Sequence, residues 1–390
     1  MKIGISGPAF FPMLQPWLHP DQKVDVKGTG GTPVNHQIIA LLERGYEVHL
    51  FTVTPEILPG DSRTWHGDKL HIYAGPFRRR ARHRTPDLYK NEREFLKAKM
   101  LEIMPDIIHA HWQYEFGWAA LDSKIPTLLT CHDAPLKVLG AQTDLYRAIR
   151  LVVAAITLKK AKYLTGVSPY TAIGQRFFTK VPVTVIPNFE PDNIFALYKP
   201  GRVISDNINI AMINNGFHGR KNVAKGILAF NEFKKSHPTA VLNLYGADNT
   251  ENGDAGKWCR DNNISGNINF HGEMPFADVI NALSQADIFL HTSLEESCPM
   301  VLIEAMAMGI PVVAGEKAGG IPWMLEDGGG ALTDITSAQK INSSLLEIVK
   351  PGQYAKASAD ARRVALERFS KEVVINKYLK FYERILSENS

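Results

Sequence analysis

Two glutamates, Glu296 and Glu304, are separated by seven residues in the stretch "EESCPMVLIEAMAMG". Residues 299–308 are helix formers, and the glycine and proline that follow predict the end of a helix. This helix is apolar on nearly every side, as is typical of a helix in a core. An ionised carboxylate in such a place is strongly unfavourable unless it is paired or hydrogen-bonded. We therefore expect Glu304 to accept hydroxyl groups of a ligand, or else to bond a backbone group or an arginine.

The residues just before this helix are expected to bind an anion. Glu296 lies in the preceding loop, and a helix N-terminus has unpaired backbone N–H groups that favour anions. The residues expected to offer these groups are Ser297, Cys298, Pro299 and Met300. The segment thus combines an anion site with two carboxylates that accept hydroxyl groups. A sugar nucleotide presents hydroxyls, a diphosphate and further hydroxyls in that order, and so matches the pattern.

A basic segment, "GRKNVAKG", contains Arg220, Lys221 and Lys225 and opens a predicted helix. The fork of an arginine matches phosphate oxygens, and a lysine adds a compact positive charge. The segment is therefore a candidate for holding a phosphate, and a solvated basic helix start is the structural alternative.

The glycine-rich segment "GTGGTP" (28–33) precedes another predicted helix. Gly30 and Gly31 would let the backbone approach a sugar or phosphate closely, and a plain turn is the alternative. It is not a dinucleotide fingerprint, because it lies more than twenty residues after the first predicted strand and lacks the third glycine.

Two histidines follow predicted strands directly. His132 stands in "TCHDAP" and His111 in "HAHW". The carboxyl ends of parallel strands are where such sheets bind ligands, so His132 is a candidate functional residue. A structural histidine is the alternative.

Two further segments are unusual for loops. "FRRRARHR" (77–84) has five arginines, and "AFFPMLQPWLHP" (9–20) is largely apolar. Such an arginine run is usually a solvated loop, but either segment is also a candidate for contact with an anionic membrane surface or with a second substrate.

Short apolar runs alternate with helical patterns along most of the chain. The predicted strands of a first series are 2–6, 47–53, 69–74, 106–110, 126–131, 163–167 and 183–187, and those of a second series are 209–214, 240–246, 267–272, 287–292 and 311–315. Predicted helices include 35–45, 222–236, 275–285, 299–308, 337–349, 354–369 and 372–387.

The stretch 186–206 is rich in turn formers and is predicted to be a linker. Buried strands that alternate with helices predict parallel sheets covered on both faces. We therefore predict an α/β protein of two Rossmann-like domains, 1–195 and 206–371, facing each other across a cleft that holds the site.

Composition excludes several classes of protein. The chain has 390 residues, a formal net charge of +4 and 45% hydrophobic residues, as in an ordinary globular protein with two cores, and this mild charge does not indicate nucleic-acid binding. Its three cysteines fit neither a zinc spacing nor a disulfide framework, which indicates a reducing compartment. No run of 18 apolar residues occurs, and the first residues resemble a strand more than a signal peptide. We expect a cytoplasmic protein.

With these motifs in this order, the chain resembles the retaining glycosyltransferases of family 4 (glycosyl transferases group 1), which have the GT-B fold. The resemblance covers nearly the whole length and rests mainly on the Glu-x7-Glu pair in "SLEESCPMVLIEAMAMGIPVVA", with "GRKNVAKG", "GTGGTP", "DIIHAHW", "TCHDAP", "VSP" and "VIPNF" in support. It implies that Glu304 binds the nucleotide ribose and that Glu296 contacts the donor sugar. It also implies the following roles: diphosphate contacts for Arg220 and Lys225, a place beside the donor sugar for His132, a place near donor and acceptor for Gly30 and Gly31, and a return to the first domain for the last helix, about 372–390.

The chain departs from the family pattern at three positions. Ser297 replaces a frequent glycine, Trp323 replaces an acidic residue, and Lys221 stands beside Arg220. The donor's base and sugar are therefore not fixed by the resemblance.

The implied reaction moves a sugar from a nucleotide diphosphate to an acceptor hydroxyl with retention. Basic groups and a helix N-terminus would stabilise the leaving diphosphate, and no Asp-x-Asp motif is present, so we expect neither a metal nor another cofactor. The implied acceptor is a glycan or lipid-linked glycan of the cell surface, reached by an enzyme that is peripheral on the inner membrane face. The alternatives are a sugar-nucleotide epimerase of similar fold and a non-catalytic subunit that binds nucleotide sugars.

Overall fold

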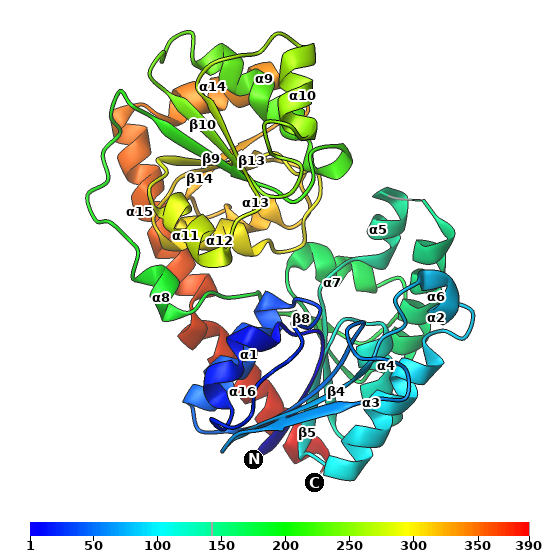
Figure 1. The fold of residues 1–390 in the computed structure, drawn as a ribbon. Coiled ribbons are helices and arrows are strands. Elements are labelled where there is room, and N and C mark those ends of the chain that lie inside the picture. The colour runs from blue at the N-terminus through cyan, green and yellow to red at the C-terminus, as the bar shows by residue number, and fades with distance from the viewer. Residues whose placement is uncertain (142, 390) are drawn as a thin grey trace. The chain divides into compact units, whose positions relative to one another are not determined.

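In the computed structural model, which describes residues 1–141 and 143–389, the chain divides into two units (Figure 1). Unit 1 comprises Met1–Pro187 and the residues from Glu372 onward, and unit 2 comprises Asn188–Lys371. Each unit is an α/β structure around a sheet of mainly parallel strands, as the alternating pattern predicts. Residues 188–195, which we had assigned to the first domain, belong to unit 2.

The sheet of unit 1 has the strand order β3-β4-β2-β1-β5-β6-β7-β8. Its strands are β1 (Lys2–Ser6), β2 (Glu47–Thr54), β3 (Arg63–His66), β4 (Leu70–Pro76), β5 (Ile107–His111), β6 (Thr127–Cys131), β7 (Tyr163–Gly166) and β8 (Val183–Val185). Neighbouring strands are parallel, except that β3 is antiparallel to β4.

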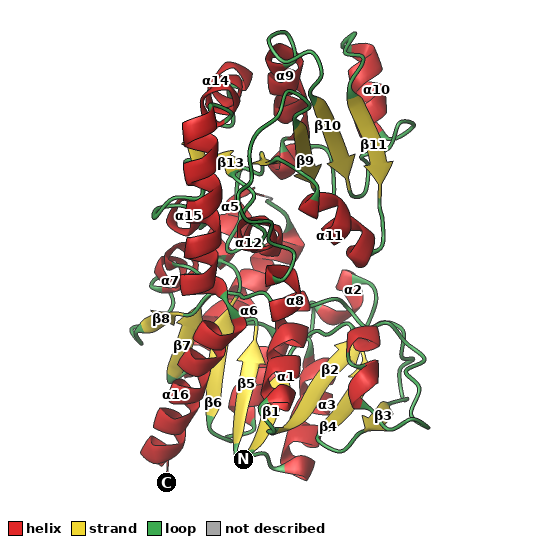
Figure 2. Cartoon of the chain, turned by 90° about the vertical axis from the view of Figure 1, so that its left-hand side faces the viewer, coloured by secondary structure: helices red, strands yellow, loops and turns green. Residues whose placement is uncertain are grey.

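Helices cover both faces of this sheet. The helix α1 (Thr32–Glu43) lies beside the last helix, α16 (Lys371–Asn389), on one face (Figures 1 and 2). A hydrogen bond of 2.7 Å from Gln37 Nε2 to the Tyr382 hydroxyl joins them. The other face carries α3 (Lys90–Ile103), α4 (Glu115–Asp122) and α6 (Leu145–Lys160), and shorter helices are η1 (Phe11–Met13), η2 (Gln15–Trp17), α2 (Ala81–Arg84), α5 (Pro135–Ala141) and α7 (Pro169–Gln175).

The sheet of unit 2 is parallel, with the strand order β11-β10-β9-β12-β13-β14. Its strands are β9 (Asn209–Ile213), β10 (Val241–Tyr245), β11 (Ile268–Gly272), β12 (Ile288–His291), β13 (Val312–Gly315) and β14 (Gly330–Thr333). Its helices are α8 (Asp192–Phe195), η3 (Gly219–Lys221), α9 (Val223–Phe233), α10 (Asp254–Asp261), α11 (Phe276–Ser284), α12 (Met300–Ala307), α13 (Ile321–Met324), α14 (Ala338–Ile348) and α15 (Pro351–Phe369). The helix α9 packs beside α14, and α12 packs beside α15.

The strand order of each sheet reverses at one place, where ligands of such sheets bind. In unit 1 the chain proceeds outward from β1 in one direction and from β5 in the other, and in unit 2 it does so from β9 and β12. The loops that follow these four strands are therefore the places where each unit is expected to hold a ligand.

Three sequence predictions need correction. The stretch 186–206 is not a plain linker, because it contains α8, whose buried Ile194 and Phe195 belong to unit 2 and which packs on α12. The strands β3 and β14 were not predicted, since both are only four residues long and β14 begins with a glycine. The apolar loop 9–20 is not wholly free to enter lipid, because Phe11, Leu14 and Leu18 are buried, whereas Trp17 is partly exposed and Phe10 is exposed.

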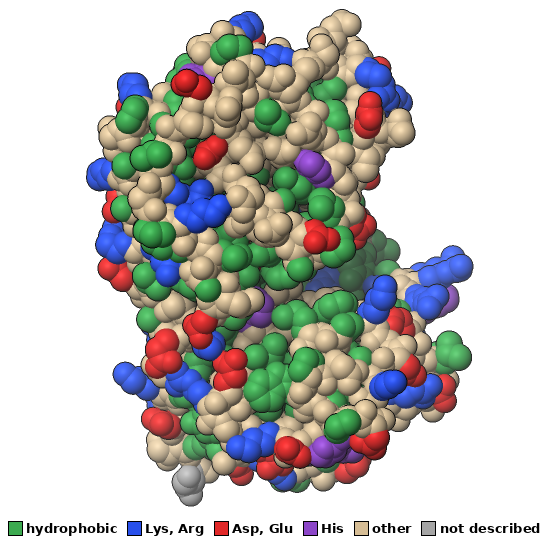
Figure 3. Space-filling view, turned by 60° about the vertical axis from the view of Figure 1, so that its left-hand side comes forward, with side chains coloured by type: hydrophobic (Ala, Val, Ile, Leu, Met, Phe, Trp, Pro, Cys, Tyr) green, Lys and Arg blue, Asp and Glu red, His purple; other side chains and the backbone are tan. Residues whose placement is uncertain are grey.

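On the face drawn in Figure 3, acidic and basic side chains are interspersed over both units. Among the described residues, no helix has the length and apolar character needed to cross a membrane.

Candidate functional site

The Glu-x7-Glu segment and the basic segment meet at the strand-order reversal of unit 2. The loop after β9 leads into η3 and carries Arg220 and Lys221, and the loop after β12 carries Glu296. Two hydrogen bonds join these loops: Leu294 N–H donates to the Arg220 carbonyl at 2.8 Å, and the Thr292 hydroxyl donates to the Lys221 carbonyl at 3.0 Å. The fold therefore brings together two segments more than seventy residues apart in sequence.

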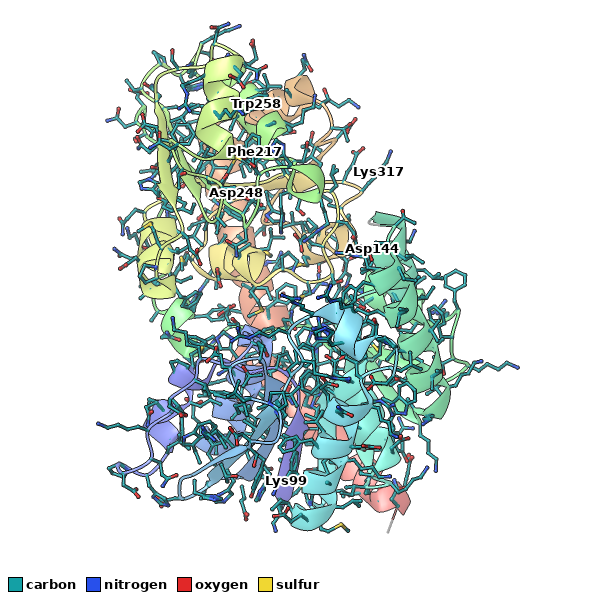
Figure 4. The ribbon with its side chains drawn as sticks, turned by 45° about the vertical axis from the view of Figure 1, so that its right-hand side comes forward. Lys99, Asp144, Phe217, Asp248, Trp258 and Lys317 are labelled. Carbon is teal, nitrogen blue, oxygen red and sulfur yellow. The ribbon has the colours of Figure 1, made fainter. Side chains whose placement is uncertain are left out.

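A buried aromatic residue anchors the first of these loops. Phe217 is fully buried, and its ring centroid lies 5.9 Å from that of Trp258 on α10 (Figure 4). The Phe217 carbonyl also accepts a hydrogen bond from Val223 N–H at the start of α9. Because both ends of the segment are held, the position of η3 does not depend on its own charged side chains.

One oxygen of Glu296 receives three donors. Its Oε1 lies 2.8 Å from Arg220 Nη1, 2.8 Å from Lys221 Nζ and 2.8 Å from the Ser293 hydroxyl. Arg220 Nη1 also donates to the Glu295 carbonyl at 2.5 Å. The arrangement brings Arg220 and Glu296 together, as their candidate roles require, places Lys221 of the same basic segment on Glu296, and adds Ser293, which the sequence did not single out.

The same contacts fix the charge of Glu296. Burial alone would raise the pKa of its carboxyl, but the positive charges of Lys221, His291 and Arg220 outweigh burial and hold the pKa at about 2. Glu296 is therefore ionised at every pH at which the protein is expected to work. The cluster of one carboxylate, Arg220 and Lys221 keeps a net positive charge, which suits an anionic ligand.

Lys225 adds a further positive charge nearby. It lies in the first turn of α9, and among the described residues its ammonium group has neither a hydrogen-bond acceptor nor an acidic partner. A lysine without a partner beside a positively charged cluster remains available to a ligand.

Three of the four residues predicted to form an anion site before α12 offer a free backbone N–H group. In the described part of the chain, the backbone N–H groups of Ser297, Cys298 and Met300 have no acceptor, and α12 has no side-chain cap. Pro299 contributes none, because proline has no backbone N–H, so its inclusion was wrong. The Asn188 amide holds this turn by donating to the Cys298 carbonyl at 2.8 Å.

Glu304 lies on α12 with its side chain nearly buried, at 5% exposure. Within the described residues no donor is hydrogen-bonded to its carboxyl, which leaves the predicted ligand role open and removes the predicted alternative of a backbone or arginine partner. Burial raises the pKa of Glu304 to about 8. Burial, followed by the charge of Glu304, also raises the pKa of Glu190 well above its ordinary value.

The strand-end histidines of unit 1 contact each other. His111 Nδ1 lies 2.9 Å from His132 Nε2, so one ring donates and the other accepts. The indole of Trp112 stacks on His132 with ring centroids 4.2 Å apart. Burial lowers the pKa of His132 to about 3 and that of His111 well below its ordinary value. Both rings are therefore neutral, and His132 can act on a ligand through a hydrogen bond but not through a positive charge.

The loop that carries His132 is fixed by Asp133. Gln113 Nε2 donates to Asp133 Oδ1 at 2.5 Å, the Tyr114 hydroxyl donates to the same oxygen at 2.9 Å, and Gln175 Nε2 donates to the Asp133 carbonyl at 2.7 Å. Two segments, the loop after β5 and the end of α7, thus position His132 at the end of β6.

The two candidate glycines, Gly30 and Gly31, differ in the space that a side chain would find at each position. Gly31 has a φ of +98°, and a Cβ there would lie 2.2 Å from the Pro8 carbonyl oxygen, so packing alone explains this glycine. Gly30 has a φ of +85°, and a Cβ there would meet nothing within 4 Å. Gly30 is therefore the one beside open space, and it precedes α1.

A pocket of about 180 Å³ opens at the strand-order reversal of unit 1. It is lined by Pro8, Thr29, Val53, Phe77, Trp112, Glu115, Phe116 and Arg150. The guanidinium of Arg150 lies 3.4 Å from the centre of the Tyr114 ring, and its Nη1 lies 3.8 Å from Glu115 Oε2. Its nearest hydrogen-bond partner among the described residues is the Tyr146 hydroxyl at 3.4 Å, so most of its donors are unused. The sequence analysis missed Arg150, because nothing in its helical segment distinguishes it from other arginines.

The arginine run 77–84 is largely engaged in structure. Arg78 forms ion pairs with Asp87 at 2.7 Å and with the buried Glu92 at 2.6 Å. Arg84 lies over the Phe77 ring at 4.5 Å and donates to the Arg79 carbonyl. Arg78 and Arg84 thus stabilise the loop. The other three arginines of the run are exposed.

Comparison with known proteins gives matches along most of the chain. The family model described as "Glycosyltransferase Family 4" matches residues 33–189, and that described as "Glycosyl transferases group 1" matches residues 198–364. The chain is 23% identical over 318 residues to an N-acetyl-alpha-D-glucosaminyl L-malate synthase of Bacillus anthracis, covering 75% of this chain and 80% of that protein. It is 25% identical over 271 residues to a GDP-mannose-dependent monoacylated alpha-(1-6)-phosphatidylinositol monomannoside mannosyltransferase of Corynebacterium glutamicum, covering 66% of this chain and 64% of that protein.

Solved structures share the whole fold. The sucrose-phosphate synthase of Thermosynechococcus elongatus superimposes with a TM-score of 0.76 at 20% identity, covering 100% of both chains. Anabaena HepE in complex with UDP-glucose superimposes with a TM-score of 0.69 at 17% identity, covering 98% of this chain and 100% of that one. At these identities the likeness concerns the fold.

Proposed function

The chain belongs to the family 4 glycosyltransferases of GT-B fold, and from this premise we propose that it moves a sugar from a nucleotide-diphosphate donor to an acceptor hydroxyl, with retention and without a metal. The observation that carries the proposal is the cluster of Arg220, Lys221 and Glu296 at the strand-order reversal of unit 2, followed by α12 with the buried Glu304. The positive charge suits the diphosphate of a sugar nucleotide, and the buried carboxyl suits its ribose hydroxyls.

In this proposal each part of the donor has its own partners. The ribose hydroxyls donate to Glu304, which has no donor of its own among the described residues. The diphosphate binds Arg220, Lys225 and the free N–H groups before α12, and Glu296 contacts the sugar. That Anabaena HepE was solved with UDP-glucose, and an E. coli protein of this fold with UDP-2-fluoro glucose, supports a donor of this class.

The chemistry that these residues supply is stabilisation of the leaving group. Negative charge grows on the diphosphate as the glycosidic bond breaks, and preorganised positive charges that are already in place stabilise it without reorganisation. The neutral His132 would hydrogen-bond the transferred sugar. Among the described residues we identify no side chain as a covalent nucleophile. The proposed route to retention is therefore attack by the acceptor on the same face of the sugar from which the diphosphate leaves.

The pocket of unit 1 supports an acceptor with an anionic group. Arg150 lines it, and the charges of Glu115 and Tyr114 hold the pKa of Arg150 above its ordinary value in spite of burial. Relatives of the chain are named for L-malate, for D-inositol 3-phosphate and for a phosphatidylinositol mannoside, all of which carry carboxylate or phosphate groups. A phosphate-linked lipid glycan of the cell surface, reached from the cytoplasmic membrane face, fits this chemistry.

Arg150→Lys is expected to raise the KM for the acceptor about tenfold, because lysine keeps the charge beside Glu115 but lacks the fork that binds an oxyanion through two donors. The KM for the donor should stay as in the wild type. Steady-state kinetics with each substrate varied in turn measure both. Arg147→Lys, a neighbour on α6 that pairs with the exposed Asp144, is the matched control. If the two variants had equal KM values for the acceptor, Arg150 would not be an acceptor-binding residue.

Removal of divalent ions tests the transferase proposal as a whole. Transfer from a nucleotide sugar to a crude acceptor extract should continue at the same rate in EDTA, because in this proposal basic side chains, and not a metal ion, stabilise the leaving diphosphate. A rate that falls to background in EDTA and returns with a divalent ion would overturn the metal-free mechanism. Conversion of the donor without an acceptor would indicate an epimerase, and nucleotide binding without turnover would indicate a binding subunit.

A further inference from the structure

Four polar residues share one face of the sheet of unit 1, at the end where β2 and β4 begin. His49 on β2 lies opposite His71 on β4, and His71 lies opposite His66 on β3. Residues opposite each other in neighbouring strands point to the same face, and so does Glu47, two residues before His49. The strand register thus places three histidines and a glutamate side by side, although the sequence separates them.

Three of these side chains converge on a common point. Glu47 Oε1 lies 2.8 Å from His49 Nε2 and 3.9 Å from His71 Nε2. The three ligand atoms all lie within 4.8 Å of one another. A tetrahedral ion with bonds of about 2.0–2.2 Å to nitrogen and oxygen needs donors about 3.3–3.6 Å apart, so small side-chain shifts suffice.

The outer nitrogens of both histidines have partners of the kind that orient metal ligands. His49 Nδ1 lies 3.3 Å from the Tyr73 hydroxyl, and His71 Nδ1 lies 3.0 Å from His66 Nδ1. Without an ion, His49 Nε2 donates to the Glu47 carboxylate, so an ion that binds both groups must displace this proton. The Tyr73 hydroxyl can accept the proton from Nδ1 of His49, and such second contacts orient metal ligands. The His49 and His71 rings are also close, with centroids 4.7 Å apart.

We propose that Glu47, His49 and His71 form a binding site for a divalent transition-metal ion of the zinc class. Two imidazoles and one carboxylate are a common ligand set for such ions, with a water to complete the coordination. The site lies where β2 and β4 begin, away from the carboxyl ends of β5 and β6 that precede His132 and carry His111. It is therefore a stabilising site, separate from the transfer reaction.

The surrounding charges modulate this site. Lys2 on β1 is the register partner of Glu47, and its positive charge acts against a cation. Lys69 is engaged elsewhere, because its ammonium donates to the Gly45 carbonyl at 3.1 Å. Glu102 on α3 pairs with Lys99 at 2.8 Å and contributes no net charge.

Calorimetric titration of metal-free, tag-free protein with Zn²⁺ alone tests the proposal. The wild type should bind one ion, and His71→Ala and Glu47→Gln should each weaken binding at least tenfold. Lys2→Gln should strengthen binding a few-fold, since it removes the opposing charge. His83→Ala, an exposed histidine of the same unit, should bind like the wild type. The three cysteines are buried and do not compete.

The variants are mild enough to separate loss of binding from loss of folding. Glu47 and His71 are partly exposed, at 43% and 20% of the side chain, so both variants should retain wild-type melting in EDTA. Zinc should then raise the Tm of the wild type more than that of either variant. Equal zinc affinity in the wild type, Glu47→Gln and His71→Ala would overturn the proposal, as would a wild type that binds no zinc at micromolar concentration.

Discussion

Arg220→Ala is expected to lower kcat by a factor of about 10²–10³ with the fold intact, because it removes a positive charge aimed at the leaving diphosphate. The fold should tolerate the change, since Lys221 and Ser293 still hold Glu296 and the Leu294 N–H still bonds the residue 220 carbonyl. Arg220→Lys should fall between the wild type and alanine, because lysine restores the charge without the fork. Rates under saturating substrates measure the effect.

A matched arginine shows whether this loss is specific. Arg363 lies on α15 in the same unit and pairs with the surface residues Asp360 and Glu367. Arg363→Ala should therefore retain wild-type kcat. If Arg220→Ala also retained wild-type kcat, the leaving group would not be stabilised by this cluster and the assigned mechanism would be wrong.

Glu304→Gln is expected to stabilise the free protein above pH 5 and to weaken nucleotide binding by a factor of about 10–100. The loss of affinity follows because an amide replaces the proposed ribose acceptor, which is expected to ionise when the hydroxyls bind, and a charge-assisted hydrogen bond contributes about 1.5–3 kcal/mol. The gain in stability follows because the buried carboxyl has no hydrogen-bond donor among the described residues. A residue retained at the expense of stability is expected at a functional site.

The pH dependence of this stability has a definite sign. The pKa of Glu304 is about 8 in the folded protein and near 4.5 when the chain is unfolded, so the folded state binds the proton more tightly. The free energy of unfolding of the wild type therefore falls as pH rises from about 4.5 to 8. Glu304→Gln removes this fall, so its advantage should be absent near pH 4.5 and reach up to about 4 kcal/mol at pH 8.

Denaturant unfolding of both proteins at pH 5, 6, 7 and 8 measures the difference directly. An effect of the glutamine side chain that does not depend on pH shifts the free energy of unfolding equally at all four pH values, so it does not alter the predicted trend. Parallel curves for wild type and variant would contradict a buried, proton-binding Glu304. Unchanged nucleotide affinity in the variant would contradict its role as the ribose acceptor, whatever the stability shows.

Local sequence patterns predicted most of the fold because each strand is a short apolar run bounded by turn formers. The strands β1, β5 and β12 lie within one residue or so of their predicted bounds, and the confirmed two-unit α/β architecture follows from their alternation with helices. The failures are local. The segment 192–195 has few apolar residues, and only its packing on α12 shows that Ile194 and Phe195 form a helix.

The candidate sites were predictable where one short segment contains the chemistry, as in Glu296 and Glu304. Contacts between distant segments were not. Neither the placement of Lys221 on Glu296 nor that of Arg150 in a pocket follows from spacing, because both depend on how strands from different parts of the chain are ordered. The pairing of His49 with His71 depends in the same way on strand register.

The measurement that tests the central claim most directly is the change in Tm that UDP, GDP, ADP and CMP produce in the wild type, with and without EDTA. A ligand at 100 times its Kd that binds only the folded state stabilises it by about 2.7 kcal/mol. EDTA is expected to lower the Tm of the free protein if zinc occupies the site at Glu47, but it should leave the nucleotide-induced increase unchanged. We predict one clear responder, whose effect on Tm Glu304→Gln reduces to about half or less, since a 10–100-fold weaker Kd leaves about 0.4–1.4 kcal/mol of stabilisation. No response to any of the four nucleotides would contradict a nucleotide site at Glu296 and Glu304.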